Sequence, residues 1–265
     1  MEWYAAYLAL GAVAGFFAGL FGIGGGLILV PALLFMFEAQ HFPVDTVMHV
    51  TLGTCMATIL FTSLASSRAH HQHGAVNWQV VRRITPGILL GTAFGALIAD
   101  AISGRGLGIC FAIFIYFSAV QILLDLRPHA ARQLPGLAGM SLMGTFTGVI
   151  CSLVSIGGGA LIVPYLVRCN VTLRHAIGTA AAIGFPVALG GTLGYVFTGL
   201  NQSALPPESA GYVYLPAMLW VSLTSVLTAP LGAKAAHRWH LKWVRRGFAC
   251  LLLILATKMI FKALA

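Results

Sequence analysis

The sequence predicts an all-α membrane protein built as a polytopic helical bundle, on three observations. Of the 265 residues, 59% are hydrophobic and only 8% are charged, whereas a soluble domain needs far more charge to cover its surface. Apolar runs of about 20 residues, the length that a helix needs to cross a bilayer, recur from one end of the chain to the other. A glycine-rich phrase interrupts this apolar pattern once in each half.

The apolar runs divide into ten predicted helical segments. Prolines, glycines and charged residues separate them, as is typical of the connections between helices. The segments cover approximately residues 3–21, 24–37, 47–66, 85–101, 106–124, 137–155, 158–167, 175–199, 211–233 and 247–264.

The glycine-rich phrase reads IGGGLILVP at 23–31 and IGGGALIVP at 156–164. Glycine costs roughly 1 kcal/mol relative to alanine at each helical position, so three in a row interrupt a helix. Matching interruptions in the two halves of a membrane protein are typical of a solute-binding site. The phrase is therefore the main sequence clue to function.

The two halves also match outside this phrase, which indicates an internal duplication. The Gly-Thr pair at 53–54 recurs at 178–179, near the start of the segment that follows each glycine phrase. We therefore expect one membrane domain made of two repeats, residues 1–130 and 131–265. Each repeat would hold five segments and open with a helix pair broken at glycine.

Positive charge indicates how these repeats are oriented, because Lys and Arg concentrate in cytoplasmic loops. If the chain passes straight through each glycine phrase, the fifteen Lys and Arg residues divide seven to eight across the membrane. If the chain turns back there, the repeats are inverted, both termini lie outside, and twelve of the fifteen fall on one side. We expect the second arrangement, in which the net charge of +9 reflects orientation and not binding to nucleic acid. The twelve residues are Arg68, Arg82, Arg83, Arg127, Arg132, Arg168, Arg174, Lys234, Arg238, Lys242, Arg245 and Arg246.

A helix that begins at a glycine break presents unpaired backbone N–H groups and the positive end of its dipole. Such an end attracts small anions, and glycine lets a ligand approach the backbone closely. In the alternative interpretation, the glycines only allow helices to pack closely. The predicted substrate-binding residues are the glycines and the nearest hydroxyls: Gly24, Gly25, Gly26, Ser155, Gly157, Gly158, Gly159, Thr54 and Thr179.

Histidines supply the other candidate functional groups. His49 and His175 lie beside the Gly-Thr pairs and are candidates for gating, because imidazole titrates near neutral pH. His70, His71 and His73 are expected in a solvated loop and not at a metal site, since no fourth ligand is fixed nearby. The chain lacks the H-E-x-x-H, G-x-S-x-G and P-loop patterns, so we expect no enzyme activity, catalytic residue, metal or cofactor.

The paired glycine phrases, the GAVNW stretch at 74–78 and the PLGA stretch at 230–233 resemble the TauE/SafE family of sulfite exporters over nearly the whole chain. The resemblance implies a multi-pass protein of the bacterial inner (plasma) membrane. It also implies export of sulfite or of an organosulfonate such as sulfoacetate. Ser155 stands where the first phrase has Gly22, so the two halves of a shared site would not be equivalent. The sequence leaves open whether the chain forms a homo-oligomer.

We therefore expect a secondary transporter that carries a small sulfur-containing anion across the lipid bilayer by alternating access around the two breaks. Two alternatives stay open from the sequence. A passive anion channel would use the same helix ends without alternating closure, and a membrane scaffold or assembly subunit would transport nothing.

Overall fold

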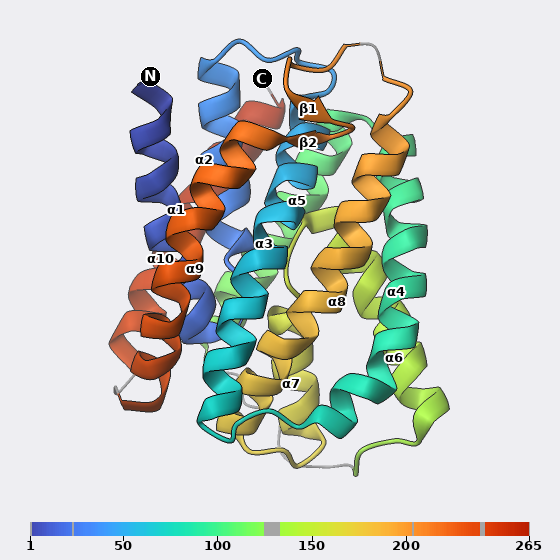
Figure 1. Cartoon of the computed structure of the whole chain (residues 1–265), viewed down its shortest axis with the longest axis vertical. Coiled ribbons are helices and arrows are strands. Elements are labelled where there is room, and N and C mark those ends of the chain that lie inside the picture. The colour runs from blue at the N-terminus through green and yellow to red at the C-terminus, as the bar shows by residue number, and fades with distance from the viewer. Residues whose placement is uncertain (1, 23, 125–132, 203, 239–241, 265) are drawn as a thin grey trace.

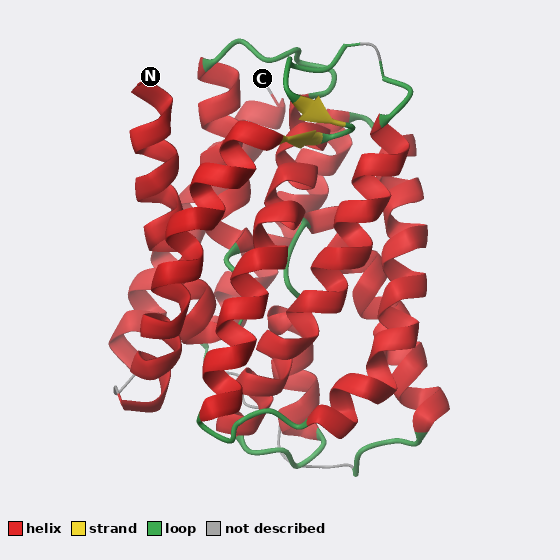
Figure 2. Ribbon diagram, in the orientation of Figure 1, coloured by secondary structure: helices red, strands yellow, loops and turns green. Residues whose placement is uncertain are grey.

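The described part of the chain forms ten helices and one short antiparallel β-hairpin, as a computed structural model shows (Figure 1). The structure describes all residues except 1, 23, 125–132, 203, 239–241 and 265. Helices dominate and strands are confined to one end of the bundle (Figure 2). The elements are α1 (Glu2–Phe21), α2 (Gly26–Ala39), α3 (Val47–Gln72), α4 (Trp78–Ala101), α5 (Gly104–Leu123), α6 (Leu137–Val154), α7 (Gly159–Arg168), α8 (Leu173–Gly199), β1 (Ser209–Ala210), β2 (Val213–Tyr214), α9 (Leu215–Arg238) and α10 (Lys242–Leu264).

The ten helices match the ten predicted segments, and the polytopic helical fold is confirmed. Within the described residues, seven helices are long and apolar enough to cross a membrane, while α2 and α7 are shorter. Several predicted segments were too short, because the helices continue beyond the apolar run into polar sequence. For example, α4 begins at Trp78 and not at 85, because the Asn77 side chain accepts hydrogen bonds from the backbone N–H groups of Gln79 and Val80.

The chain turns back at both glycine breaks. Near the start of α1, the Tyr7 oxygen accepts a 2.7 Å hydrogen bond from Gln40, which directly follows α2. The Tyr165 hydroxyl in α7 similarly donates to the sulfur of Met140 near the start of α6, at 3.9 Å. The first hairpin enters from the upper end in Figure 1 and the second from the lower end. An inverted repeat would have this arrangement, and the division into residues 1–130 and 131–265 stays a prediction.

Glycine stripes join each hairpin to a helix from the other half. Helix α1 packs on α9, and α4 packs on α6. In both interfaces glycines recur every fourth residue against the backbone of the partner, so the helix axes approach closely. These glycines are Gly11, Gly15 and Gly19 of α1 and Gly87, Gly91 and Gly95 of α4.

Helix α3 is the most enclosed of the long helices. In its most apolar stretch 83% of the residues are buried, against 33–56% in the other candidate spans. It packs against α8 and α9, and α8 packs in turn against α4. Large apolar side chains such as Phe94 and Leu97 of α4 face outward, as expected where a helix contacts lipid. The threonines and serines of α3 therefore lie in the protein interior.

Charge is divided between the two ends of the bundle. The ten described Lys and Arg residues of the predicted cytoplasmic group lie within about two turns of helix ends at the lower end in Figure 1. Arg127 and Arg132, the other two in the group, lie outside the described residues. We call the lower end the basic end. Glu38, Asp45, Asp100 and Glu208 lie at the opposite end, so the charge rule predicts a cytoplasmic basic end.

Replacing Gly91 by alanine should destabilise the fold. The added methyl group would collide with the Thr145 carbonyl oxygen across the α4–α6 interface, and overpacking of this kind costs about 1–3 kcal/mol. Gly108→Ala in α5 is the matched control, because nothing lies within 4 Å of the added carbon. Thermal unfolding in detergent should show a lower Tm for Gly91→Ala only. Equal Tm values for the two variants would contradict the close α4–α6 contact.

Candidate functional site

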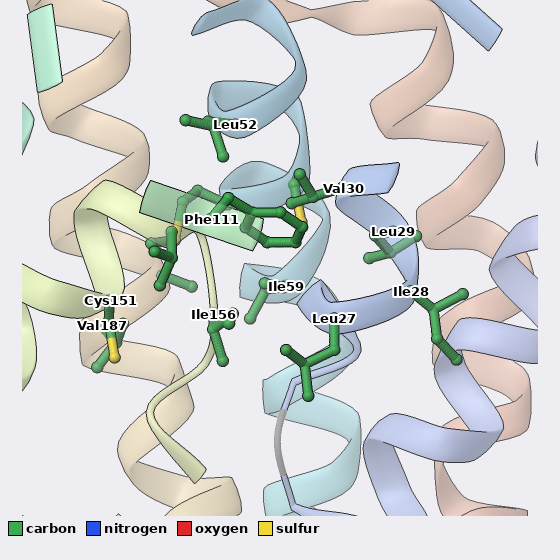
Figure 3. Close-up of a cluster of buried hydrophobic side chains, with 14 of the residues drawn as sticks. Leu27, Ile28, Leu29, Val30, Leu52, Ile59, Phe111, Cys151, Ile156 and Val187 are labelled. Atoms are coloured by element: carbon green, nitrogen blue, oxygen red, sulfur yellow. The ribbon is translucent and has the colours of Figure 1, made fainter. Parts of the chain in front are cut away.

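The two glycine breaks meet at the centre of the molecule. A methyl group on Gly24 would lie 2.9 Å from the Cα atom of Gly157, and Gly26 packs directly on the Ser155 carbonyl oxygen. The side chains of Leu27, Ile59 and Ile156 gather around this contact (Figure 3). We call the described residues within 22–26 and 155–159 the central crossing.

The backbone of the central crossing requires glycine. Gly24, Gly25 and Gly158 have φ angles of +75°, +80° and +82°, a left-handed conformation that glycine adopts without steric cost. Gly25 and Gly158 are the N-caps of α2 and α7, and neither helix start has a side-chain cap. Uncapped helix starts of this kind present backbone N–H groups and a positive dipole end.

The two helix starts point in opposite directions. Helix α2 leads from the central crossing towards the upper end of the bundle, and α7 leads towards the basic end (Figure 1). The positive end of the α2 dipole therefore faces the basic side of the crossing, whereas that of α7 faces the other side. A small anion on either side of the crossing would meet one helix N-terminus.

Ser155 anchors the second break to α3. It is fully buried with φ +47°, and its hydroxyl donates a 2.9 Å hydrogen bond to the Leu52 carbonyl oxygen. Its own carbonyl oxygen accepts a 3.5 Å contact from the Cys55 thiol. The corresponding position in the first break, Gly22, has no side chain. The two breaks are therefore held differently, and their backbones also differ, because Gly24 has a positive φ angle and its counterpart Gly157 does not.

Thr54 and Thr179 hold the connections that follow α8 and α3. The Thr54 hydroxyl oxygen accepts a 2.9 Å hydrogen bond from the backbone N–H of Tyr214. The Thr179 hydroxyl oxygen accepts a hydrogen bond of the same length from the backbone N–H of Asn77. Both threonines are fully buried. The structure thus gives the two side chains a matching structural role, and their contact with a substrate stays a prediction.

His49 belongs to a polar cluster at the end opposite the basic end. Its Nε2 atom lies 3.1 Å from the carbonyl oxygens of Ala99 and Ile102. Its ring stacks on Tyr212 at a centroid distance of 5.0 Å, and the Tyr212 hydroxyl donates a 2.9 Å hydrogen bond to Asp100. Burial, followed by the Asp100 carboxylate, raises the pKa of Tyr212, so this hydroxyl stays a proton donor.

The other histidine candidates, at positions 70, 71, 73 and 175, lie near the basic end. His175 is exposed, and its Nδ1 atom lies 2.8 Å from the Thr172 hydroxyl at the start of α8. The start of α8 is at the opposite end of the bundle from the start of α3, which carries His49 (Figure 1). The expectation of a solvated loop is wrong for His70, which is fully buried in the last turn of α3. Its Nε2 atom lies 3.0 Å from the Gly19 carbonyl oxygen of α1. The two gating candidates are therefore not brought together.

His70 and Tyr195 form a matched pair that was not predicted from the sequence. The Tyr195 hydroxyl donates a 2.9 Å hydrogen bond to the Ser152 carbonyl oxygen. In the same way, the Nε2 atom of His70 lies 3.0 Å from the Gly19 carbonyl oxygen. The two carbonyls occupy the same place in the two copies, five residues before Gly24 and Gly157. One buried polar side chain thus holds each helix just before it breaks. Because the side chains differ, comparing residue types between the halves could not find the pair.

A small hollow adjoins the first break. Glycine and alanine of α1, its break and α8 line one part, and three hydroxyl side chains of α3 line the rest. These hydroxyls lie within an apolar segment and were not among the predicted site residues. Polar residues deep in a membrane span are themselves a functional signal. The lining residues are Ala18, Gly22, Gly24, Thr62, Ser63, Ser66, Ala181 and Gly184.

The chain belongs to the TauE/SafE family. The family described as "Sulfite exporter TauE/SafE" matches residues 7–259, which is nearly the whole chain. The match covers both glycine breaks and every helix that meets at the central crossing. The protein is therefore a membrane transporter by class.

Individual relatives agree with this class. A "Probable membrane transporter protein" of Haemophilus influenzae is 34% identical over 257 residues, covering 96% of this chain and 97% of the relative. One of Methanocaldococcus jannaschii is 26% identical over 90% of this chain and 88% of its own. The "Probable membrane transporter protein YdhB" of Bacillus subtilis is 27% identical over 72% of this chain and 78% of its own. A search of solved structures found no match.

Replacing Thr54 by valine should destabilise the connection before α9. Valine keeps the shape of the side chain but leaves the partly buried N–H of Tyr214 without its acceptor, which costs up to about 1–3 kcal/mol. Thr58→Val is the control, because that hydroxyl only donates to the Thr54 carbonyl oxygen within the same helix. Hydrogen exchange at the Tyr214 amide should accelerate in Thr54→Val and not in Thr58→Val. Unchanged exchange in both would remove the structural role assigned to Thr54.

Proposed function

We propose that this transporter carries a small sulfur-containing anion, such as sulfite or an organosulfonate, by alternating access around the central crossing. Family membership supports the substrate class, because the family is named for sulfite export. The observation that carries the mechanism is the meeting of two uncapped helix starts, at Gly25 and Gly158, from opposite directions. The proposal places the substrate at this crossing, with Ser155 as part of its wall.

Backbone groups and hydroxyls are the proposed recognition elements. The described Lys and Arg residues lie within about two turns of helix ends, so in this part of the chain no cationic side chain is at mid-membrane depth. Partial charges at helix N-termini suit an anion that must bind and then leave, because they attract it without forming a tight ion pair. The glycine backbone provides the close approach that such weak contacts need.

The helix pairs provide the proposed moving parts. The glycine-packed interfaces make α1 with α9 one unit, and α4 with α6 another. Each unit carries one of the broken hairpins, so a shift between the units would open the crossing to one side and close it to the other. This is the rocking motion by which transporters built from repeats expose a central site in turn to the two sides.

Gly158→Ala tests the central crossing. No atom would lie closer than 3.6 Å to the added carbon, so the main cost is the left-handed backbone, about 1–2 kcal/mol. Gly74→Ala is the matched control, with φ +66°, no atom within 4 Å, and a position remote from the crossing. In proteoliposomes, sulfite flux should fall at least about ten-fold in Gly158→Ala only. Equal flux in both variants would contradict the proposed site.

Kinetics of the unaltered protein distinguish a carrier from a channel. Alternating access predicts that sulfite uptake into vesicles saturates and is accelerated by unlabelled sulfite on the other side. A passive channel would instead give a measurable current in a planar bilayer with no such acceleration. Failure to move sulfite, sulfoacetate, sulfate or thiosulfate would overturn the proposed substrate class and leave the family assignment intact.

A further inference from the structure

The hollow beside the first break lies on the basic side of the central crossing. Helix α3 meets the crossing at Ile59, whose side chain lies 3.1 Å from a methyl group built on Gly24. The hydroxyl residues at 62, 63 and 66 follow about one to two turns further on, as α3 continues towards the basic end. The positive end of the α2 dipole faces this same side.

Ser66 is the side chain in the hollow whose hydrogen-bonding capacity is unused. It is only 2% exposed, and its Oγ atom has no hydrogen-bond partner. The neighbouring hydroxyls are engaged, since Thr62 contacts Ser225 at 2.6 Å and Ser63 donates to the Leu60 carbonyl oxygen at 3.1 Å. An unpaired buried hydroxyl costs about 1–3 kcal/mol, so its presence in the hollow requires an explanation.

The positions of the second half that match Thr62 and Ser66 carry no hydroxyl group, and the space beside one of them is filled by an apolar side chain. The Gly-Thr register at 53–54 and 178–179 pairs Thr62 with Val187 and Ser66 with Gly191. Around Gly191 the space is occupied by Met56, whose sulfur would lie 3.0 Å from an added methyl group. Thr62 and Ser66 therefore have no hydroxyl counterpart at the matching positions of the second half.

We propose that this hollow is the contracted form of the inner substrate chamber, and that Ser66 is a specificity-determining residue which donates a hydrogen bond to an oxygen of the transported oxyanion. The inference rests on the proposed function. In this conformation the hollow is too narrow for a water molecule. The substrate is admitted when the α1–α9 unit moves away from α8, where only Ala181 and Gly184 line the wall.

The test compares Ser66→Ala with Ser118→Ala, using sulfite as the probe. Ser118 is a matched control, because it is also buried, 1% exposed, without a hydrogen-bond partner, and on α5 outside the hollow. Neither substitution removes a hydrogen bond of the folded state, so both variants should keep or slightly raise the Tm. In proteoliposomes, Ser66→Ala should raise the KM for sulfite roughly ten-fold, because a charged acceptor loses its donor.

Sulfite binding to purified protein gives a second measurement. Sulfite should raise the Tm of the unaltered protein and of Ser118→Ala, and raise it less in Ser66→Ala at the same concentration. Equal KM values and equal Tm shifts in the two variants would overturn the role of Ser66 while leaving sulfite transport standing. An unaltered protein that neither binds nor moves sulfite would overturn the proposed function and this inference together.

Discussion

The contact between Gly24 and Gly157 is the constraint on which the rest of the structure depends. Two backbones can cross this closely only where neither carries a side chain, so the two breaks fix each other in place. Because the hairpins meet there, α3 and α8 must pass on either side of the contact, and the remaining helices close around them. The left-handed glycines, the buried Ser155 and the enclosed α3 all follow from building a membrane protein around this crossing.

The overall architecture was largely predictable, because membrane helices can be recognised from the length and hydropathy of their sequence. The charge distribution also favoured turning back at Gly24 and Gly157, and the path of the chain agrees with it. Helix ends were harder, since α3 and α4 continue through polar sequence that hydropathy excludes. The short hairpin at 209–214 has too few residues to show a strand period, and residues 211–214 were therefore included in the predicted helical segment 211–233.

The candidate site was predictable only in part. Glycine phrases give the position of the breaks, because their backbone conformation is a local property of the residues. Partners from distant elements are not local. The sequence could not reveal that the Thr54 hydroxyl is occupied by the amide of Tyr214, or that His70 is buried against Gly19. The candidate role of the α3 hydroxyls was also not predictable. Only its burial distinguishes Ser66 from an ordinary polar residue of a helix, and burial is not visible in the sequence.

The pairing of α1 with α9 has a consequence for how the protein is made. The glycine face of α1 is synthesised first, yet the helix that covers it begins only at Leu215. At about 5–20 residues per second, a nascent chain waits roughly 10–40 s for that partner. During this interval a strip of exposed backbone lies in the bilayer without its neighbour. Biogenesis thus depends on the translating ribosome, the insertion machinery or the surrounding lipid to shield α1 until α9 has been synthesised.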